Sequence, residues 1–491
     1  MMLLRNRRAI VLGSGIFFLA SCAPVGPNYK RPSAPIPVSF KEPLPAGWKQ
    51  AEPGGAFAKG KWWEIYNDPA LNALEEQVSV TNQNVLQAEA QYREARALAR
   101  EARSALFPTV GVGVGITATG AGGAASNAAG ANGSSNAGTR TAYSLPFNVA
   151  WEPDLWGSIR RIVTGDIEFA QASEADLENA RLLYQAELAQ DYFQLHGIDG
   201  EADLLQTTSD SYNEYLTLTK NRYAAGVASD LDVAQAESQL YSAQSALIDL
   251  GEQRAQLEHA IAILTGKPPS DVSIPPEPLS MPPPPIPVGL PSDLLERRPD
   301  IASAERRVAA ANEQIGIAMA AFYPAFTLSG SAGLNASSLA KWFTWPSRFW
   351  SVGPGLSETL FDAGRRRAVV AQQQAAYDAT VAGYRQNVLT ALQQVEDNLA
   401  ALRVLSDEND KLQQTIQSAD RALTISSAQY RAGTTSYLTV ITSQATLLGS
   451  QRSAIQLLSR RLTASVLLVE ALGGGWDSTR LPTRQDVMAA R

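Results

Sequence analysis

An internal repeat constrains this chain more than any other feature of its sequence. The stretch WEPDLWGSIRR around Gly157 returns as SETLFDAGRRR around Gly364, 207 positions later. Upstream of these glycines the spacing is 216, as between Pro108 and Pro324. Such a period is far longer than that of solenoid repeats, which run about 20–50 residues. We therefore expect two copies of one unit of roughly 200 residues.

Two short segments of each unit alternate between apolar and small or polar residues, which is the period of a β-strand. They predict strands at about 109–118 and 142–152 in the first unit, and at about 325–334 and 349–361 in the second. Strands of about ten residues with one apolar face and one wet face are typical of outer-membrane barrels. The alternative is a soluble antiparallel sheet with one buried face.

After each pair of strands the sequence pattern becomes helical. No proline occurs in the roughly 60 residues after Gly157, and at 1.5 Å per residue these would form a helix of roughly 90 Å. From Val233 to Leu264, apolar residues recur at alternating steps of three and four, which is the period of a coiled coil. We expect a long helical hairpin in each unit, with tips near 226 and 433.

Aromatic residues mark the two joints at which strand gives way to helix. Trp151 and Trp156 occupy the first joint, and Phe361 occupies the second. Aromatic side chains are favoured at the interface between membrane and water. We therefore expect both joints to lie at a membrane surface.

Acidic residues stand just before both predicted helices. Asp154 and Asp362 can accept hydrogen bonds from the free N–H groups of a helix start. The alternative, a catalytic pair of Glu152 and Asp154, is disfavoured because a similar arrangement occurs twice. The arginines that follow, at 160–161 and 365–367, lie at the unfavourable end of the helix dipole. We expect a compensating partner for them, such as anionic lipid head groups.

The composition of the chain argues against metal and thiol chemistry. There are two histidines, His196 and His259, and one cysteine, Cys22, which cannot supply a zinc site or a Cys/His nucleophile. The formal net charge is -7 and no long basic run occurs, so nucleic acid is not an expected partner. We predict a protein that is not an enzyme and binds no metal and no cofactor.

The N-terminus carries the pattern of an exported lipoprotein. Residues 1–21 combine a basic start with an apolar run too short to span a bilayer. They lead into LASC, which resembles a bacterial lipobox and predicts a covalent lipid on Cys22. A buried cysteine beside an ordinary signal peptide is the alternative. Ala23 stands where Asp usually retains lipoproteins in the inner membrane, so the resemblance favours the outer membrane.

Three stretches beside the lipobox carry a resemblance to a known family. They are LLERRPDIASAERRVAAANEQIGIAMAAFYP at 294–324, RYAAGVASDLDV with its echo QYRAGTTSYLTV, and ALGGGW at 471–476. The chain resembles the TolC-like outer membrane factor family, and within it the OprM/NodT-type efflux lipoproteins. The resemblance implies a mixed α+β membrane protein. In it, a homotrimer forms a twelve-stranded outer-membrane β-barrel that continues as a long periplasmic α-helical barrel with an equatorial belt.

The repeat and the resemblance together predict how the chain is organised. Each repeat holds a helical part, two strands and a long hairpin. The predicted segments are a lipoprotein signal peptide at 1–21, an extended N-terminal segment at 22–60, the first repeat at 61–266, a proline-rich equatorial linker at 267–293, the second repeat at 294–476 and a C-terminal tail at 477–491.

The function that the resemblance implies is a passive exit duct in the outer membrane. Such a duct belongs to a tripartite efflux system with an inner-membrane pump and a periplasmic adaptor, or membrane fusion protein. It passes small molecules or drugs to the exterior and performs no chemistry. Two alternatives stay open: a duct for type I protein secretion, and a lipid-anchored structural trimer without a pore. The small and polar strand faces favour a pore.

The hairpin tips are the sites that the resemblance assigns to partners. The adaptor would dock at Gly226, Val227, Ser229, Gly433, Thr434 and Thr435. Asp230 and Asp232 are gate candidates, held by basic residues such as Arg222 or Arg431. Their counterparts in the second repeat are neutral, which puts a double acidic ring in doubt. The alternative is that both aspartates only stabilise a helix start.

Overall fold

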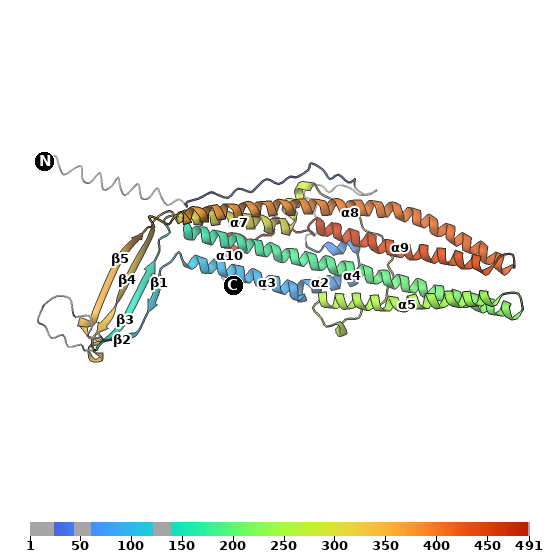
Figure 1. Ribbon diagram of the computed structural model, residues 1–491, viewed down its shortest axis with the longest axis horizontal. Coiled ribbons are helices and arrows are strands. Elements are labelled where there is room, and N and C mark those ends of the chain that lie inside the picture. Colours follow the sequence, from blue (N-terminus) through green and yellow to red (C-terminus); the bar gives the residue numbers. More distant parts are fainter. Residues whose placement is uncertain (1–23, 44–59, 121–138, 490–491) are drawn as a thin grey trace.

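The computed structural model describes residues 24–43, 60–120 and 139–489. They form an elongated molecule with a β-sheet at one end and long helices along the rest of its length (Figure 1). The predicted signal peptide and Cys22 lie outside the described residues. Within these three ranges, every helix is too short or too polar to serve as a membrane span.

The main helices occur in pairs of equal length, one from each repeat. α4 and α8 have 67 residues each, α5 and α9 have 35, and α3 and α7 have 22. The α8 and α9 helices begin 207 residues after α4 and α5, while α7 begins 216 residues after α3. The helices are η1 (Trp62–Tyr66), α2 (Pro69–Thr81), α3 (Gln83–Ser104), α4 (Ser158–Ala224), α5 (Asp230–Leu264), η2 (Pro269–Asp271), η3 (Pro291–Asp293), α6 (Leu294–Arg297), α7 (Pro299–Ala320), η4 (Leu339–Lys341), η5 (Trp345–Ser347), α8 (Arg365–Arg431), α9 (Tyr437–Ala471), η6 (Ser478–Arg480) and α10 (Arg484–Met488).

One antiparallel sheet has the strand order β1–β3–β4–β5, with β2 also paired to β3. Its strands are β1 (Thr109–Val112), β2 (Gly115–Thr119), β3 (Arg140–Trp151), β4 (Ala325–Ala336) and β5 (Arg348–Ser357). The β1 and β2 strands keep one register against β3, so they are two parts of a single strand position. The break between them falls beside Pro146, which has no N–H for the ladder. The sequence predicted one continuous strand at 109–118, and this proline explains the difference.

The helices lie side by side in the same order as the strands. Close to the sheet, α4 packs between α3 and α7, and α7 also packs on α8. Towards the tips, α4 packs between α5 and α9, and α9 also packs on α8. The long helices α4 and α8 therefore run past shorter helices placed one after the other (Figure 1). One edge of this helical wall is formed by α3 and α5 and the other by α8.

The main core lies midway along the helices, where both repeats meet the linker. The ring of Tyr66 from η1 packs 4.9 Å from the ring of Phe193 in α4. The α8 helix contributes one apolar stripe with helical spacing, formed by Tyr384, Val388, Ala391, Val395, Leu399, Leu402 and Leu405. A second cluster lies closer to the tips and buries the predicted coiled-coil residues Ala236, Leu240, Ala243 and Leu250.

Candidate functional sites: the sheet, the joints and the hairpin tips

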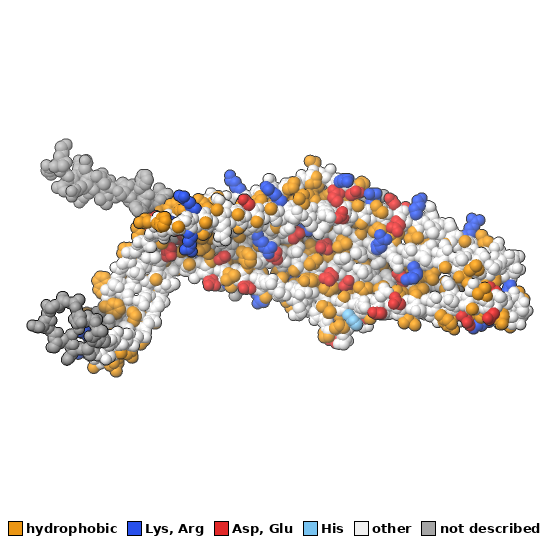
Figure 2. Space-filling model, viewed as in Figure 1, with side chains coloured by type: hydrophobic (Ala, Val, Ile, Leu, Met, Phe, Trp, Pro, Cys, Tyr) orange, Lys and Arg blue, Asp and Glu red, His pale blue; other side chains and the backbone are white. Residues whose placement is uncertain are grey.

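The two faces of the sheet differ in chemistry. Strand pairing places Val110, Val149 and Val352 in one row, and all three side chains are exposed. Figure 2 shows hydrophobic side chains at the surface of the sheet end of the molecule. The opposite face carries small and polar residues, where Ser331 Oγ donates to Asn148 Oδ1 over 2.8 Å. The sheet thus presents an apolar surface on one side and a surface that water can solvate on the other.

At both joints, an aspartate binds the start of the long helix that follows. Asp154 accepts hydrogen bonds from two backbone N–H groups of α4 at 3.1 and 2.9 Å. Asp362 accepts from the N–H groups of Gly364 and Arg366 at 3.0 and 3.2 Å. Each carboxylate also pairs with an arginine side chain, Arg160 at 3.0 Å and Arg366 at 2.7 Å. The two acids are therefore helix-start residues.

These contacts correct the hypothesis that lipid head groups compensate the arginines of the first joint. Arg160 is paired by Asp154, and Arg161 is paired by Glu313 of α7 over 2.7 Å. The side chains of Arg161 and Glu313 are only 5% and 10% exposed, so this pair has little access to lipid. Carboxylates of the chain itself therefore offset the unfavourable position at the helix dipole. No local pattern links Arg161 to Glu313, which is why the sequence did not predict the pair.

The joint aromatics have different surroundings. Trp156 Nε1 donates to the carbonyl oxygen of Pro324 at 2.8 Å, and Trp151 Nε1 donates to that of Leu106 at 3.1 Å. The polar edges of both tryptophans are thus bound to backbone beyond the ends of α7 and α3. Phe361, by contrast, is 86% exposed. Of the three predicted interface aromatics, Phe361 leaves the largest apolar surface uncovered.

Both hairpin tips end their outgoing helix with the same turn. Gly226 and Gly433 have φ angles of 73° and 76°, a left-handed conformation that glycine adopts without steric cost. In each turn the next N–H group reaches the carbonyl oxygen five positions earlier, from Val227 at 2.8 Å and from Thr434 at 3.0 Å. This is the Schellman arrangement. The tips lie at the end of the molecule opposite the sheet (Figure 1).

The return helices begin with different side-chain contacts. Ser229 and Asp232 form a capping box, in which the Ser229 hydroxyl accepts from the Asp232 N–H at 3.2 Å and the Asp232 carboxylate accepts from the Ser229 N–H at 2.9 Å. The α9 helix starts without a side-chain cap, and the Thr435 hydroxyl donates to Thr439 Oγ1 at 3.1 Å. Asp230 is the first residue of α5.

A basic residue connects the two hairpins near their tips. Arg222 Nη1 donates to the carbonyl oxygens of Tyr430 and Arg431 at 3.1 and 3.4 Å. Its guanidinium also lies 4.7 Å from the centre of the Tyr430 ring. A cation at the last carbonyls of α8 interacts favourably with the helix dipole. Within one chain, Arg222 thus binds carbonyl groups, and not the aspartates that the sequence suggested for it.

A buried polar network that the sequence did not reveal holds the linker against α4 and α5. Asp199 lies 3.0 Å from His196 Nδ1 and accepts from Arg254 Nε at 2.7 Å. Arg254 donates to the carbonyl oxygen of Ile274, and the N–H of Glu277 donates to Asp199 at 3.0 Å. Burial acts to raise the pKa of Asp199, but the hydrogen bonds from His196 and Arg254 outweigh it and lower that pKa. His196 and Arg254 therefore help to hold the linker in place through Asp199.

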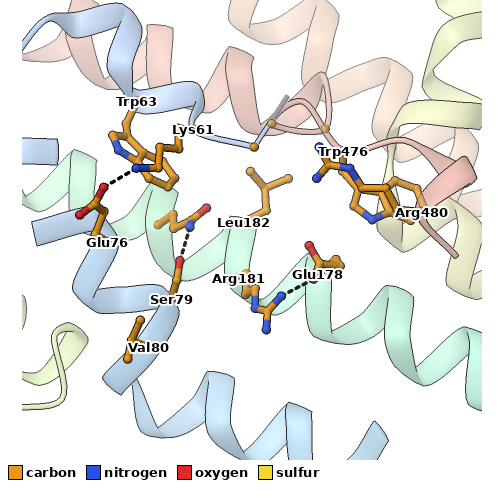
Figure 3. A pocket seen from close by; sticks show the side chains of 14 residues that line it. Lys61, Trp63, Glu76, Ser79, Val80, Glu178, Arg181, Leu182, Trp476 and Arg480 are labelled. Atoms are coloured by element: carbon orange, nitrogen blue, oxygen red, sulfur yellow. Dashed lines mark hydrogen bonds and ion pairs between the residues drawn. The ribbon is translucent and has the colours of Figure 1, made fainter. Parts of the chain in front are cut away.

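A cavity of about 550 Å³ lies between η1, α2, α4 and the segment after α9 (Figure 3). Its charged side chains include two ion pairs, Lys61 with Glu76 and Arg181 with Glu178. Across the part of the chain that the structure describes, no cluster of histidine, cysteine and acidic residues could hold a metal ion. The cavity offers paired charges rather than a nucleophile beside a base.

Strands and helices together define a class of membrane protein. A sheet with one apolar and one polar face suits strands that separate lipid from water. The α4 and α8 helices, at 67 residues each, reach about 100 Å away from that sheet. Such a chain is held in a membrane by its strands and extends a helical wall into the adjacent compartment.

The chain belongs to the outer membrane efflux protein family, whose pattern matches residues 74–267 and 290–474. The pyoverdine export outer membrane protein OpmQ of Pseudomonas aeruginosa is 32% identical over 451 residues, which cover 91% of this chain and 94% of OpmQ. The toluene efflux pump outer membrane protein TtgF of Pseudomonas putida is 30% identical over 476 residues, which cover 94% and 95%. The solved outer-membrane channel OprN has a TM-score of 0.84 and 29% identity, covering 92% of this chain and 99% of OprN.

Membership of this family confirms three predictions from the sequence. The protein is an outer membrane factor, it serves as an efflux duct of the outer membrane, and it is not an enzyme. The family pattern matches the chain in two segments, one in each repeat.

Proposed function

We propose that three copies of the chain assemble into one duct, a twelve-stranded barrel continued by a tube of helices. The open edges of the chain carry this proposal: β1 with β2 and β5 in the sheet, α3 with α5 and α8 in the helical wall. Open strand edges in lipid leave backbone groups unpaired, and single-chain bacterial barrels have at least about eight strands. Edge-to-edge pairing repeated by rotation closes a ring.

The duct accepts small molecules from an inner-membrane pump through a periplasmic adaptor and releases them outside the cell. The names of relatives suggest the cargo class, because OpmQ is named for pyoverdine and TtgF for toluene. In the assembled barrel the face with Asn148 and Ser331 lines the water-filled lumen, and the face with Val110 and Val149 contacts lipid.

Conductance and mass test the proposal together. Native mass spectrometry of the purified protein should give the mass of three chains, and planar bilayers should show ion conductance. Cells that lack the protein should lose tolerance to toluene-class compounds and regain it on complementation. A trimer without conductance would favour the structural alternative. Loss of a secreted protein with unchanged tolerance would favour type I secretion.

The predicted lipid on Cys22 anchors the chain beside its barrel. Because the chain has one cysteine, a fatty acid on sulfur can have no other position. Radiolabelled palmitate should label the wild-type protein and fail to label Cys22→Ser. A labelled Cys22→Ser protein would show that the lipobox assignment is wrong. Partial function should survive the substitution, because strands that span the membrane hold the protein there independently.

The two tips form the docking surface for the adaptor. Val227 and Ser229 at the first tip and Thr434 and Thr435 at the second lie beside left-handed glycines, in turns that close the helical wall. The variants Ser229→Trp and Thr435→Trp should reduce crosslinking to the adaptor while trimers persist. Ser270→Trp, in the exposed linker, is the matched control. Equal crosslinking in all three variants would place the docking surface elsewhere.

Asp230 and Asp232 form an acidic ring at the closed end of the duct. Their position in the first turn of α5, at the far end from the sheet, supports this role. Asparagine can still accept hydrogen bonds at a helix start, so the double variant Asp230→Asn/Asp232→Asn separates charge from capping. It should lower cation selectivity and raise conductance in bilayers. Unaltered selectivity and opening would leave the aspartates with their helix-start role alone.

A further inference from the structure

Residues 24–43 form an extended strap along the outside of α7 and α8 (Figure 1). At its far end, the Glu396 carboxylate of α8 accepts from the backbone N–H groups of Lys41 and Glu42 at 2.6 and 2.9 Å. Midway, Arg385 donates to the carbonyl oxygen of Ser33 at 3.1 Å. The strap is thus bound along its length by its backbone, and its side chains Tyr29, Ile36 and Phe40 also pack against the main core.

At its other end the strap enters the first joint and is bound there on both sides. The N–H of Val25 donates to the carbonyl oxygen of Trp156 at 2.9 Å, and the carbonyl oxygen of Val25 accepts from Arg161 Nε at 2.7 Å. The carbonyl oxygen of Pro27 accepts from Asn312 Nδ2 at 3.1 Å. These donors and acceptors come from the joint itself, from α4 and from α7.

Two glycines allow this close approach. Gly26 has a φ angle of 109°, and a Cβ on it would lie 2.6 Å from the Cα of Gly316. A Cβ on Gly316 would in turn overlap the Arg161 side chain. Arg161 is held in place by its buried pair with Glu313. Arg161 therefore connects the strap to α7. The close approach of Gly26 and Gly316 restricts the path that residues 24–27 can follow.

The second joint provides a natural control because, in the part of the chain that the structure describes, no strap contacts its glycine. A Cβ on Gly157 would lie 2.6 Å from Pro24, whereas a Cβ on its counterpart Gly364 would meet nothing within 4 Å. Both glycines precede a 67-residue helix with left-handed φ angles of 81° and 89°. The counterpart of Arg161 in the second repeat is Ala368. The features that bind the strap are therefore specific to the first joint.

We propose that Trp156, Arg161, Asn312, Glu313 and Gly316, here called the strap site, form a binding site for the N-terminal peptide of the mature chain. The site recognises residues 24–27 by their backbone and by the absence of a side chain at Gly26. The two residues from Cys22 to Pro24 span at most about 7 Å of chain. A lipid on Cys22 would thus enter the membrane at the level of the first joint. This last step rests on the proposed acylation, whereas the strap site does not.

Trypsin cleavage after the exposed Lys30 tests the strap site in the full-length protein. A protease must lift several residues from the surface, so a weaker site speeds cleavage. Arg161→Gln removes a charged hydrogen bond to the strap, whereas Gly157→Ala and Gly26→Ala each add a methyl group that overlaps a neighbouring residue. Each of the three variants should be cleaved at least about tenfold faster than the wild type. The last substitution changes only the strap and cannot disrupt the helical wall. Mass spectrometry of the released peptide measures the rate, and circular dichroism verifies equal helix content.

The matched controls come from the second joint. Gly364→Ala has the same backbone strain without a strap contact, and Arg366→Gln removes the arginine that pairs with Asp362. Both should keep the wild-type cleavage rate. Cys22→Ser should also stay protected, because the strap site acts without the lipid. The proposal is overturned if Gly26→Ala and Gly157→Ala are cleaved no faster than Gly364→Ala, or if Cys22→Ser alone removes the protection.

Discussion

The two hairpin tips share their turn but not the contacts that start their return helices. At the first tip, α5 begins with the exposed Asp230 beside a capping box of Ser229 and Asp232. At the second, α9 begins with Tyr437, which is buried and packs 5.2 Å from the ring of Tyr430. One helix start is stabilised by local hydrogen bonds and the other by packing against α8.

The two tips show which part of the duplicated unit the fold requires to be the same in both copies. The left-handed glycine and the Schellman hydrogen bonds set the direction in which the chain returns, and they occur in both repeats. The residues after the turn need only satisfy a helix start, and several solutions exist for that. The first tip consequently carries acidic groups at a position where the second carries an aromatic ring.

Loss of the buried Tyr437 ring at the second tip should give the largest change in stability. Tyr437→Ala leaves a cavity and should destabilise the tip of the second hairpin by about 3–5 kcal/mol. Hydrogen exchange of the second-turn amides of α9, which are bonded within the helix, would measure this. Tyr437→Phe keeps the ring and should remain close to wild type. Asp230→Ala at the matching position should cost less than about 1 kcal/mol. Equal exchange rates in Tyr437→Ala and Asp230→Ala would show that packing stabilises the second helix start no more than the exposed Asp230 stabilises the first.

A second difference between the repeats lies in α4, where Glu174 corresponds to Val381 of α8. Burial, and then the neighbouring Glu178, raise the pKa of Glu174 to about 7. Between its ordinary pKa of 4.5 and about 7, the folded chain holds a proton that the unfolded chain releases. Stability therefore falls as pH rises through this window.

Replacement of the Glu174 carboxyl should remove this loss of stability at high pH. Glu174→Gln should stabilise the protein by about 1–3 kcal/mol at pH 8, and the gain should shrink below about pH 5. Urea unfolding in detergent at both pH values measures it. Glu214→Gln, another α4 glutamate and one that is exposed, is the control and should show no comparable gain. A gain for Glu174→Gln that is the same at pH 5 and pH 8 would refute titration of this group.

Removal of the capping box should give the smallest effect. Asp232→Ala deletes the carboxylate that accepts from the Ser229 N–H and should cost about 1 kcal/mol. Its counterpart variant, Thr439→Ala, removes only hydroxyl contacts on an exposed side chain and should change stability less. Exchange rates of the second-turn amides of α5 and α9 would separate the two. If Thr439→Ala were the more damaging variant, the hydroxyl contacts of Thr439 would stabilise the second tip more than the capping box stabilises the first.

The sequence predicted the fold well where one pattern recurs locally. Periods of two and of three to four placed strands and helices, and the spacing of 207 predicted that the second hairpin repeats the first. Asp154 and Asp362 were interpreted as helix-start acids because their position alone implies that contact, and both make it. These features depend on residues that are neighbours in the chain.

Contacts between distant segments could not be predicted in this way. Glu313 reaches Arg161 from another helix, and Asp199 binds the linker at Glu277, which follows it by 78 residues. Nothing in the sequence around Arg161 distinguishes it from Arg160, although one binds the strap and the other binds its own joint. Partner choice of this kind depends on three-dimensional packing.

The equal lengths of paired helices also restrict how such a chain can evolve. Residues 157–266 of the first repeat align with residues 364–473 of the second without a single insertion or deletion. A lengthened α4 would overshoot α8 at the tips unless α5, α8 and α9 gained the same number of residues in the same lineage. The nine-residue difference between the repeats falls between Pro108 and Gly157, the interval that contains the connection between the strands. The two repeats therefore differ in length only at the sheet end, where an added residue need not be matched by any other helix of the wall.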